Sequence, residues 1–299
     1  MSTLAAIILT CNEELHIERC IRSLQAVTEE IYVIDSFSND GTVEIAKKSG
    51  AKVLQNKWIN YAIQFNWGIQ NADISAPWIL RMDADEYLSE ELVGELKEKL
   101  PILEKDVTGL TLNYRHYFWG RWIKHGTRYP IPLLRIWRNG VGKIENKWMD
   151  ERVVLSEGRT IQLKSDFNHD DLHDLTFFIQ KHNGYATREA IDLLNKEYKA
   201  YQEEDPATSK SHFNLYLKNK FYSGSFLFIR AFIYFFYRYF IRLGFLDGIP
   251  GLVYHFLQGF WYRFLVDAKI YELKRKFKND RGEIVEYIKE KFSSPNPSR

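Results

Sequence analysis

The chain has 299 residues, of which 45% are hydrophobic and 27% charged, and this is the composition of an ordinary globular protein. It contains only two cysteines, Cys11 and Cys20, which excludes the disulfide framework of a small secreted protein. The amino terminus lacks a basic segment and reaches a polar stretch at Asn12 too early for a secretory signal peptide, so we expect a cytoplasmic protein.

The net charge of +2 conceals an uneven distribution. Residues 208–299 carry 16 Lys and Arg against 7 Asp and Glu, whereas residues 1–207 carry 25 against 32. A basic carboxyl-terminal third on an acidic body indicates a polyanionic neighbour, either nucleic acid or an anionic membrane.

Short apolar runs alternate with amphipathic helical patterns over the first hundred residues. This alternation indicates right-handed βαβ units, and therefore an α/β fold with a mostly parallel, Rossmann-like sheet and flanking helices. In such sheets, ligands bind outside the carboxyl ends of the strands. The predicted strands are residues 4–9, 31–34, 52–54 and 78–82, and the predicted helices begin at residues 17, 43, 61 and 89.

Acidic or polar residues follow three of these strands. Asn12 and Glu13 follow the first, Asp35 the second, and Asp83 with Asp85 the fourth. In extended chain Asp83 and Asp85 would point to the same side, and two close carboxylates repel unless a cation lies between them. The pattern therefore favours a metal–diphosphate site, and a solvated turn before a helix is the alternative. Glycine-rich phosphate loops are absent from the sequence, so a nucleotide would be held through acids and a metal.

The chain resembles the inverting family 2 glycosyltransferases of the GT-A fold in three ordered motifs. These are Ile-Leu-Thr-Cys-Asn-Glu at 8–13, Val-Ile-Asp-Ser-Phe-Ser-Asn-Asp-Gly-Thr at 33–42 and Met-Asp-Ala-Asp-Glu at 82–86. Within the family, the resemblance is strongest to bacterial lipopolysaccharide-core β-glucosyltransferases and related capsule or O-antigen enzymes. It runs through most of the chain and is weakest over the last 25 residues.

The resemblance implies a role for each strand-end residue. The family often has two adjacent acids and a glycine after the second strand, where this chain has Asp35-Ser36-Phe37, so one base contact is lost or replaced. The implied roles are a nucleotide pocket lined by Thr10, Asn12 and Glu13, a base or ribose contact at Asp35, a ribose contact at Asp83, and a diphosphate-bridging Mg²⁺ or Mn²⁺ at Asp85.

The βα pattern fades after Pro101, and β-rich runs at residues 109–117 and 132–137 follow. In the resembling enzymes this half receives the acceptor sugar, and an acid pair supplies the general base. Inverting transfer needs a carboxylate that takes the proton of the acceptor hydroxyl. We predict Glu151 as this base, with Asp150 orienting it. The alternative is a surface pair that forms salt bridges with neighbouring basic residues.

Other candidates lie around this half. Arg135 and Arg138 either clamp phosphate or line a solvated strand edge. Trp122 either stacks on a sugar face or is a core aromatic. His169 resembles a family histidine near the active site. In the segment from His169 to His173, a structural or acceptor-side role is favoured over a zinc site.

We predict a catalytic domain over residues 1–205, with a nucleotide-sugar half (1–100) and an acceptor half (101–205). Residues 206–299 form a helical, basic and aromatic region. Its run 225–243 is long enough to span a membrane, but it contains three arginines, Arg230, Arg238 and Arg242, that share one helical face. This predicts an interfacial helix with arginines among anionic headgroups.

A second helix over 252–273 ends in the polybasic cluster 274–278. The alternative for the two helices is packing on the catalytic domain or on a second subunit, and a homo-oligomer stays open. A nucleic-acid binder is disfavoured because no recognisable nucleic-acid module is present.

We therefore expect an inverting, metal-assisted hexosyltransferase, with glucose favoured as the sugar and a UDP-sugar as the donor. Its acceptor would be a lipid-anchored glycan, and the enzyme would be peripheral on the inner face of the cytoplasmic membrane. Transfer to a polyprenyl phosphate shares every amino-terminal motif and is the second hypothesis. A catalytically dead sugar-binding scaffold is the alternative from another class, and the complete set of acids disfavours it.

Overall fold

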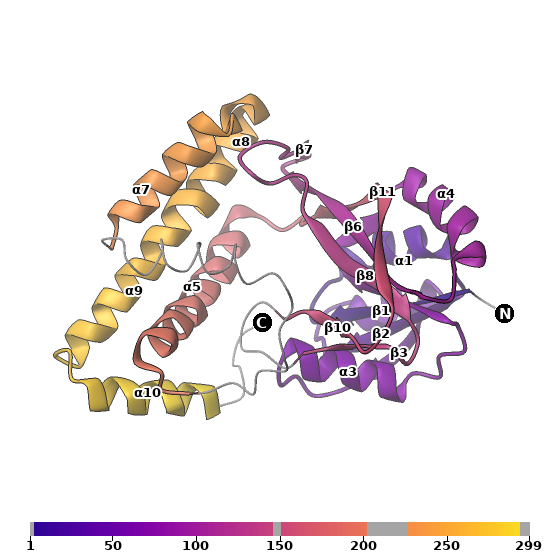
Figure 1. The fold of residues 1–299 in the computed structure, drawn as a ribbon, viewed down its shortest axis with the longest axis horizontal. Coiled ribbons are helices and arrows are strands. Elements are labelled where there is room, and N and C mark those ends of the chain that lie inside the picture. Colours follow the sequence, from indigo (N-terminus) through magenta and orange to yellow (C-terminus); the bar gives the residue numbers. More distant parts are fainter. Residues whose placement is uncertain (1–2, 146–150, 202–226, 294–299) are drawn as a thin grey trace. The chain divides into compact units, whose positions relative to one another are not determined.

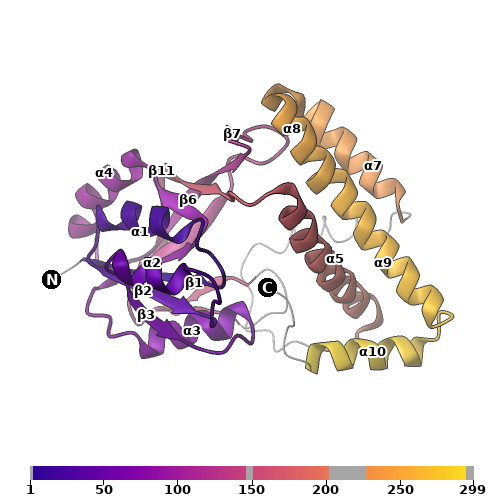
Figure 2. The same ribbon diagram turned by 180° about the vertical axis from the view of Figure 1, so that it is seen from behind.

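The computed structural model describes residues 3–145, 151–201 and 227–293. The chain divides into two compact units, residues 1–173 and 174–298 (Figures 1 and 2). The predicted boundary at residue 205 lies outside the described residues. The units divide earlier, because helix α5 (Leu175–Tyr198) packs with the carboxyl-terminal helices and belongs to the second unit.

The first unit is an α/β structure, as predicted. Its first hundred residues alternate strands and helices, and a β-rich stretch follows. In chain order the elements are β1 (Leu4–Thr10), α1 (Ile17–Gln25), β2 (Glu30–Asp35), α2 (Thr42–Lys48), β3 (Lys52–Gln55), α3 (Tyr61–Asn71), β4 (Trp78–Asp83), β5 (Glu86–Leu88), α4 (Glu90–Lys99), η1 (Leu100–Ile102), β6 (Val107–Phe118), β7 (Arg121–Trp122), β8 (Pro132–Arg138), β9 (Gly142–Ile144), β10 (Val153–Leu155) and β11 (Arg159–Asp170).

One large sheet organises this unit, with strand order β3-β2-β1-β4-β8-β6-β11-β5. Strands β3, β2, β1 and β4 are parallel, as the βα alternation predicts. Strand β8 is antiparallel to both β4 and β6, while β11 runs parallel to β6 and antiparallel to β5. The acceptor half therefore extends the same sheet with mixed pairing. Strands β9 and β10 form a separate antiparallel pair.

Alternate residues of β1 enter two different cores because successive side chains of a strand point to opposite faces. Leu4, Ala6 and Ile8 pack with apolar residues of α1, α2 and α4. Ala5, Ile7 and Leu9 pack with α3 and with residues of β8 and β9. Helices therefore cover both faces of the sheet, which explains why β1 is apolar throughout (Figure 2).

The second unit consists of α5, α7 (Ile229–Phe236), the π-helical turn η2 (Tyr237–Ile241), η3 (Gly244–Asp247), α8 (Gly248–Tyr254), the π-helical turn η4 (His255–Trp261), α9 (Tyr262–Lys276) and α10 (Arg281–Ser293). Apolar residues of α5, α9 and α10 form its core. α7 and η2 form one arm of a helical hairpin, and α8, η4 and α9 form the other (Figure 1). Among the described helices, none combines the length and apolar content that a membrane crossing requires.

The prediction that the arginines of the first arm face lipid headgroups is wrong for two of the three. Arg230 is buried and pairs with Asp267 of α9. Arg238 is buried as well and donates to Gln258 of η4. Both lie on one helical face, as predicted, but that face packs against the second arm. Only Arg242 is exposed.

Candidate active site

The carboxyl ends of β1, β2 and β4 lie at one edge of the sheet. Thr10 is paired in register with Asp35, and Leu9 is paired with Asp83. The predicted convergence of the strand-end residues is therefore confirmed for this edge, which we call the acid edge. Asp85 does not continue the strand as expected, because Ala84 and Asp85 form a turn between β4 and β5.

Asp35 anchors the loop that follows β2. Its buried carboxylate accepts hydrogen bonds from the Thr10 hydroxyl (3.1 Å), the Ser38 amide (3.0 Å) and Gln55 Nε2 (2.9 Å), and also from the Ser38 hydroxyl. Protein groups thus occupy both carboxylate oxygens. A direct contact of Thr10 or Asp35 with a nucleotide stays a prediction, whereas their support of the loop is visible in the structure.

Reciprocal hydrogen bonds join the loops after β1 and β2. The Asn12 amide donates to the Ser38 hydroxyl (2.8 Å), and the Asn39 amide donates to Asn12 Oδ1 (2.9 Å). Asn12 adopts a positive φ of 59°, which asparagine tolerates better than most residues. The Glu13 amide donates to Thr42 Oγ1 (2.7 Å). The predicted nucleotide-binding residues therefore lie on one connected surface made of two loops.

Asp83 keeps part of its carboxylate open to solvent, with the side chain 32% exposed. Tyr61 donates its hydroxyl to Oδ1 (2.8 Å), and Arg135 Nη1 lies 3.8 Å from Oδ2. Partial burial alone would raise the pKa of Asp83, but the nearby guanidinium groups of Arg135 and Arg81 outweigh it, so the pKa lies below its usual range. Asp83 is therefore an anion with an open side, as a ribose or metal contact requires.

Glu86 and Arg135 form a buried bidentate ion pair that the sequence analysis did not identify. Arg135 Nη1 and Nη2 lie 3.0 and 2.6 Å from the two Glu86 oxygens, and the Asp83 amide donates to Glu86 Oε2 (2.8 Å). Burial and the neighbouring Asp83 and Asp85 raise the pKa of Glu86, although Arg135 opposes them. Arg135, predicted as a phosphate clamp, lies at the acid edge, where it holds the turn between β4 and β5.

Asp85 and His169 lie close together on neighbouring elements. His169 Nε2 is 3.3 Å from Asp85 Oδ2, and β11 places His169 in register with Glu86 of β5. The His169 ring stacks on His116, with Nδ1 atoms 3.0 Å apart. The Asp170 amide donates to the Asp85 carbonyl (3.0 Å), which fixes the turn against β11. The structure thus places His169 at the acid edge, beside the predicted metal ligand.

A carboxylate oxygen and an imidazole nitrogen are suitable donors for a divalent cation such as Mn²⁺. Adjacent ligands of one ion with bonds of about 2.1 Å lie about 3 Å apart in octahedral geometry. The 3.3 Å separation of Asp85 and His169 is close to this value, and Asp83 adds a second open carboxylate nearby. The residues at the acid edge therefore fit a divalent metal.

A second cluster joins His16, Asp171 and His173. The Leu172 amide donates to His16 Nε2 (2.9 Å), so the ring proton of His16 lies on Nδ1, which faces Glu13 Oε2 at 2.8 Å. Both ring nitrogens of His16 are thus used by the protein. This agrees with the predicted structural role of the segment and disfavours a zinc site there. The cluster ties the loop that carries Glu13 to the end of β11.

The structure does not bring Arg138 to the acid edge. Arg138 is paired with Trp78 at the opposite end of β4, and its guanidinium donates to the backbone carbonyls of Leu103, Glu104 and Val107. Trp122 lies in β7, half-buried. Arg115 and Lys124 each lie 5.2 Å from its ring centroid. Sugar stacking by Trp122 stays a prediction.

Glu151 is half-buried and precedes β10. Asp150 lies outside the described residues, so the predicted acid pair is placed only in part.

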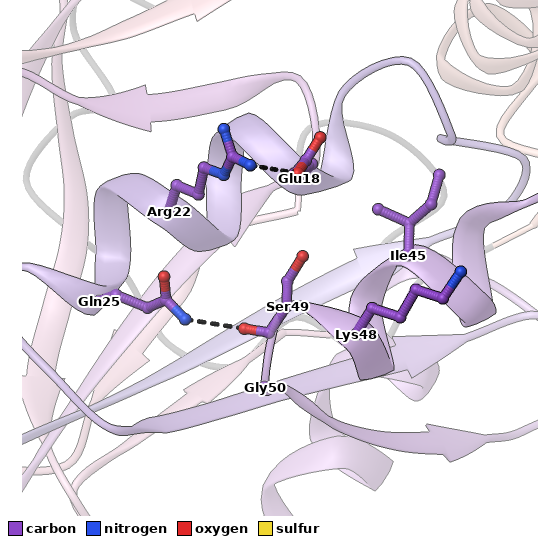
Figure 3. A pocket seen from close by; sticks show the side chains of 7 residues that line it. All are labelled: Glu18, Arg22, Gln25, Ile45, Lys48, Ser49 and Gly50. Atoms are coloured by element: carbon purple, nitrogen blue, oxygen red, sulfur yellow. Dashed lines mark hydrogen bonds and ion pairs between the residues drawn. The ribbon is translucent and has the colours of Figure 1, made fainter.

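An open pocket lies between α1 and α2 (Figure 3), away from the strand-end acids. A hydrogen bond from Gln25 to the Ser49 carbonyl (2.7 Å) crosses it, and an ion pair between Arg22 and Glu18 (2.6 Å) lies along its α1 side. Its lining consists of surface residues of the two helices and Gly50, and it contains none of the predicted site residues.

Comparison with known proteins identifies relatives of the first unit. The family model of glycosyl transferase family 2 matches residues 5–161. An uncharacterised glycosyltransferase of Rickettsia typhi is 40% identical over 97 residues, which are 32% of each chain. The lipopolysaccharide core biosynthesis glycosyltransferase LpsC of Rhizobium meliloti is 29% identical over 160 residues, 52% of this chain and 58% of LpsC. The alignments thus span about a third to somewhat over half of these relatives.

Among solved structures, glucosyl-3-phosphoglycerate synthase of Mycobacterium tuberculosis is 22% identical, with a TM-score of 0.32 over 38% of this chain and 44% of that chain. The family match is the stronger finding, because it covers more than half of the chain and contains the three strand-end motifs. The chain therefore belongs to glycosyl transferase family 2, as its motifs predicted.

Proposed function

We propose that this glycosyltransferase moves a hexose, with glucose favoured, from a nucleoside diphosphate sugar to a lipid-anchored glycan such as lipopolysaccharide core or a capsule or O-antigen precursor. The similarity to LpsC, which is named for lipopolysaccharide core biosynthesis, supports the acceptor class, and the motifs at residues 8–13, 33–42 and 82–86 support the nucleotide-sugar donor. UDP is the favoured nucleotide of the donor.

The observation that carries the proposal is the acid edge. Asp83 and Asp85 follow β4, and His169 reaches Asp85 from β11. Asp85 and His169 would hold a divalent metal, with Asp83 facing the ribose. When bound, this metal neutralises the charge that develops on the leaving diphosphate. Asn12 and Glu13 would line the nucleotide pocket from the loop after β1, which hydrogen bonds join to the loop after β2.

The transfer that we propose is a single displacement with inversion. A bond forms between the acceptor oxygen and the anomeric carbon while the bond from that carbon to the diphosphate oxygen breaks. The nucleoside diphosphate leaves with the electron pair of the broken bond. Glu151 takes the proton of the acceptor hydroxyl, and Asp150 orients Glu151. No second nucleophile is needed, since the acceptor itself attacks.

We place the reaction at the cytoplasmic face of the cytoplasmic membrane. Nucleotide sugars are polar donors, whereas the proposed acceptor is held by its lipid at the bilayer surface. An enzyme bound to that surface finds such an acceptor by diffusion in two dimensions. The basic charge of residues 208–299 supports attraction to anionic lipid.

The test is to incubate the full chain with candidate nucleotide sugars, Mn²⁺ or Mg²⁺, and extracted lipopolysaccharide or lipid-linked glycan. We expect nucleoside diphosphate release that depends on the acceptor, and an acceptor mass increase of one hexose. If the mass increase falls on polyprenyl phosphate instead, the second hypothesis is correct. If no donor is consumed with any acceptor while nucleotide still binds, the sugar-binding scaffold replaces the enzyme hypothesis.

A further inference from the structure

The first arm of the helical hairpin exposes one continuous apolar face. Its exposed residues recur at spacings of three and four, so they share one side of the helix. Buried residues Arg230, Ala231 and Arg238 lie on the opposite side, against the second arm. The exposed residues, which we call the outer face, are Ile229, Phe232, Ile233, Phe236, Tyr237, Phe240 and Ile241.

The turn of the hairpin extends this apolar surface. Leu243, Phe245 and Leu246 are exposed around η3, and Ile249, in α8, is 74% exposed. Between residues 229 and 264, all of which the structure describes, Arg242 is the only charged side chain classed as exposed. Soluble monomers rarely expose so large a contiguous apolar surface, so this one indicates an interaction site.

The hairpin buries five ionisable residues: Arg230, Arg238, Asp247, His255 and Asp267. Arg230 Nε lies 2.8 and 3.0 Å from the two Asp267 oxygens, and the Phe228 amide donates to Asp267 Oδ2 (2.7 Å). Arg238 donates to Gln258. His255 Nε2 lies 3.6 Å from Asp247, and both residues are buried. In a lipid environment, a helical protein places its ionisable groups inside and its apolar side chains outside. The hairpin shows this arrangement.

We propose that the outer face and the hairpin turn lie in the boundary between acyl chains and headgroups of an anionic bilayer, with the first arm parallel to the membrane plane. Each exposed aromatic or aliphatic side chain then leaves water. Arg230 and Asp267 stay paired within the protein, and among residues 229–264 Arg242 is the only exposed charged side chain that has to meet the bilayer. Arg242 lies at the end of the arm, where it can reach anionic headgroups.

The length of the arm favours a position on the bilayer surface over a membrane crossing, and the charge favours a bilayer over a second copy of the chain. α7 has eight residues and η2 has five, so the arm measures roughly 20 Å at 1.5 Å per residue, against about 30 Å for the hydrocarbon core. Residues 227–293 carry 12 Lys and Arg and 7 Asp and Glu. Two copies of this region, each with a net charge of +5, repel each other, whereas an anionic bilayer attracts each of them.

The test is flotation of the full chain with vesicles of phosphatidylcholine alone or mixed with phosphatidylglycerol, in the absence of donor sugar. The informative variant is Ile233→Glu, on the outer face, where the side chain is 57% exposed. Its matched control is Ile102→Glu in the first unit, where the side chain is 76% exposed. Both substitutions place the same charge at an exposed isoleucine, so neither removes a core contact.

We expect the unmodified chain and Ile102→Glu to float with the anionic vesicles, and Ile233→Glu to partition at least tenfold less. High salt should weaken flotation without abolishing it, since the apolar contact is not screened. The proposal is overturned if the unmodified chain does not float, or if Ile233→Glu floats equally well. A lipid-free dimer that Ile233→Glu dissociates would identify a second copy as the occupant and would also overturn it. Activity plays no part in this readout, so its result is separate from that of the transferase assay.

Discussion

The acid edge and the helical hairpin both place charged groups in protected positions, but they do so in opposite ways. At the acid edge the sheet is apolar on both faces, and the carboxylate of Asp83 stays partly open to solvent. In the hairpin, Asp267 is fully buried and closed off by Arg230, while the apolar side chains are outside. An anion with an open side can meet a ligand, whereas an anion closed by its partner can only support the fold.

The comparison shows that burial of a charge does not identify a functional site. Asp83 and Asp267 both contact arginine, yet only Asp83 lies at a strand end beside further carboxylates. Two properties therefore distinguish a ligand-binding carboxylate from one that only stabilises the fold: the residues beside it, and whether part of it stays open to solvent. The following predictions test this separation, from the largest expected effect to the smallest.

Replacing the proposed metal ligand should have the largest effect on activity. We expect Asp85→Asn to reduce kcat/KM by more than about 10³-fold, because the variant loses the charge that would hold the metal against the diphosphate. Metal titration should show weaker binding in the same variant. Asp73→Asn, at an exposed position, is the matched control and should behave like the unmodified enzyme. Near-normal activity of Asp85→Asn in a chelator would contradict the metal site.

The proposed base should affect the chemical step more than binding. Glu151→Gln keeps the shape of the side chain but cannot accept the proton, so kcat should fall by about 10² to 10⁴-fold while nucleotide affinity stays unchanged. Glu157→Gln, at an exposed position, is the control. A greater loss of kcat in Asp150→Asn would exchange the two roles. If neither acid matters, the base lies elsewhere.

Breaking the internal ion pair of the hairpin should reduce stability without changing the chemistry. Arg230→Leu leaves the buried Asp267 carboxylate unpaired, which costs about 3–5 kcal/mol. Hydrogen exchange of the α7 and α9 amides in the full chain should report this loss. The double variant with Asp267→Leu removes both charges and should recover much of it. If the double variant is less stable than Arg230→Leu, the pair contributes net stability and our comparison with the acid edge needs revision.

The smallest expected effect concerns Glu95, a buried carboxylate of the first unit whose hydrogen-bond donors all come from the protein. It accepts hydrogen bonds from the Lys164 and Ser165 amides (3.1 and 2.8 Å) and from Lys99 (2.6 Å). Burial alone would raise the pKa of Glu95, but these donors outweigh it and lower the pKa to about 2. A depressed folded-state pKa stabilises the fold above the ordinary value near 4.5, and this stabilisation is lost as the pH falls towards 2.

We therefore expect Glu95→Gln to cost about 1–3 kcal/mol at pH 7, and the difference from the unmodified chain to shrink as the pH falls below about 4.5. Chemical unfolding across this pH range measures both quantities. Glu98→Gln, exposed on the same helix, is the control and should show neither effect. A difference that stays constant down to pH 3 would mean that the charge of Glu95 is not what stabilises this region.

The sequence predicted the first hundred residues well because local pattern and tertiary role agree there. Strands β1, β2 and β4 are short apolar runs, and α1 repeats its apolar residues at helical spacing. The strand ends carry the polar residues, so the acid edge followed from the order of elements. The family resemblance added the functional meaning of that edge.

Features that depend on distant contacts were not predictable in the same way. Strand β11 was not predicted because only Ile161, Leu163 and Phe167 of its twelve residues are apolar, and its buried residues include the polar Asp166 and Asn168. The Glu86–Arg135 pair joins residues 49 positions apart, so no local sequence pattern predicts it. Arg230 of α7 and Arg238 of η2 share a face as predicted, but a helical wheel cannot show that Asp267 and Gln258 would lie opposite them.

The reciprocal hydrogen bonds between the loops after β1 and β2 have a consequence for evolution. Asn12 both donates to the second loop and accepts from it, through Ser38 and Asn39, so neither loop keeps its shape if the other changes alone. Substitutions in the two segments should therefore show strong epistasis, with single changes harmful and matched pairs tolerated. When donor preference changes during evolution, we expect both loops to change together while the strands beneath them stay the same.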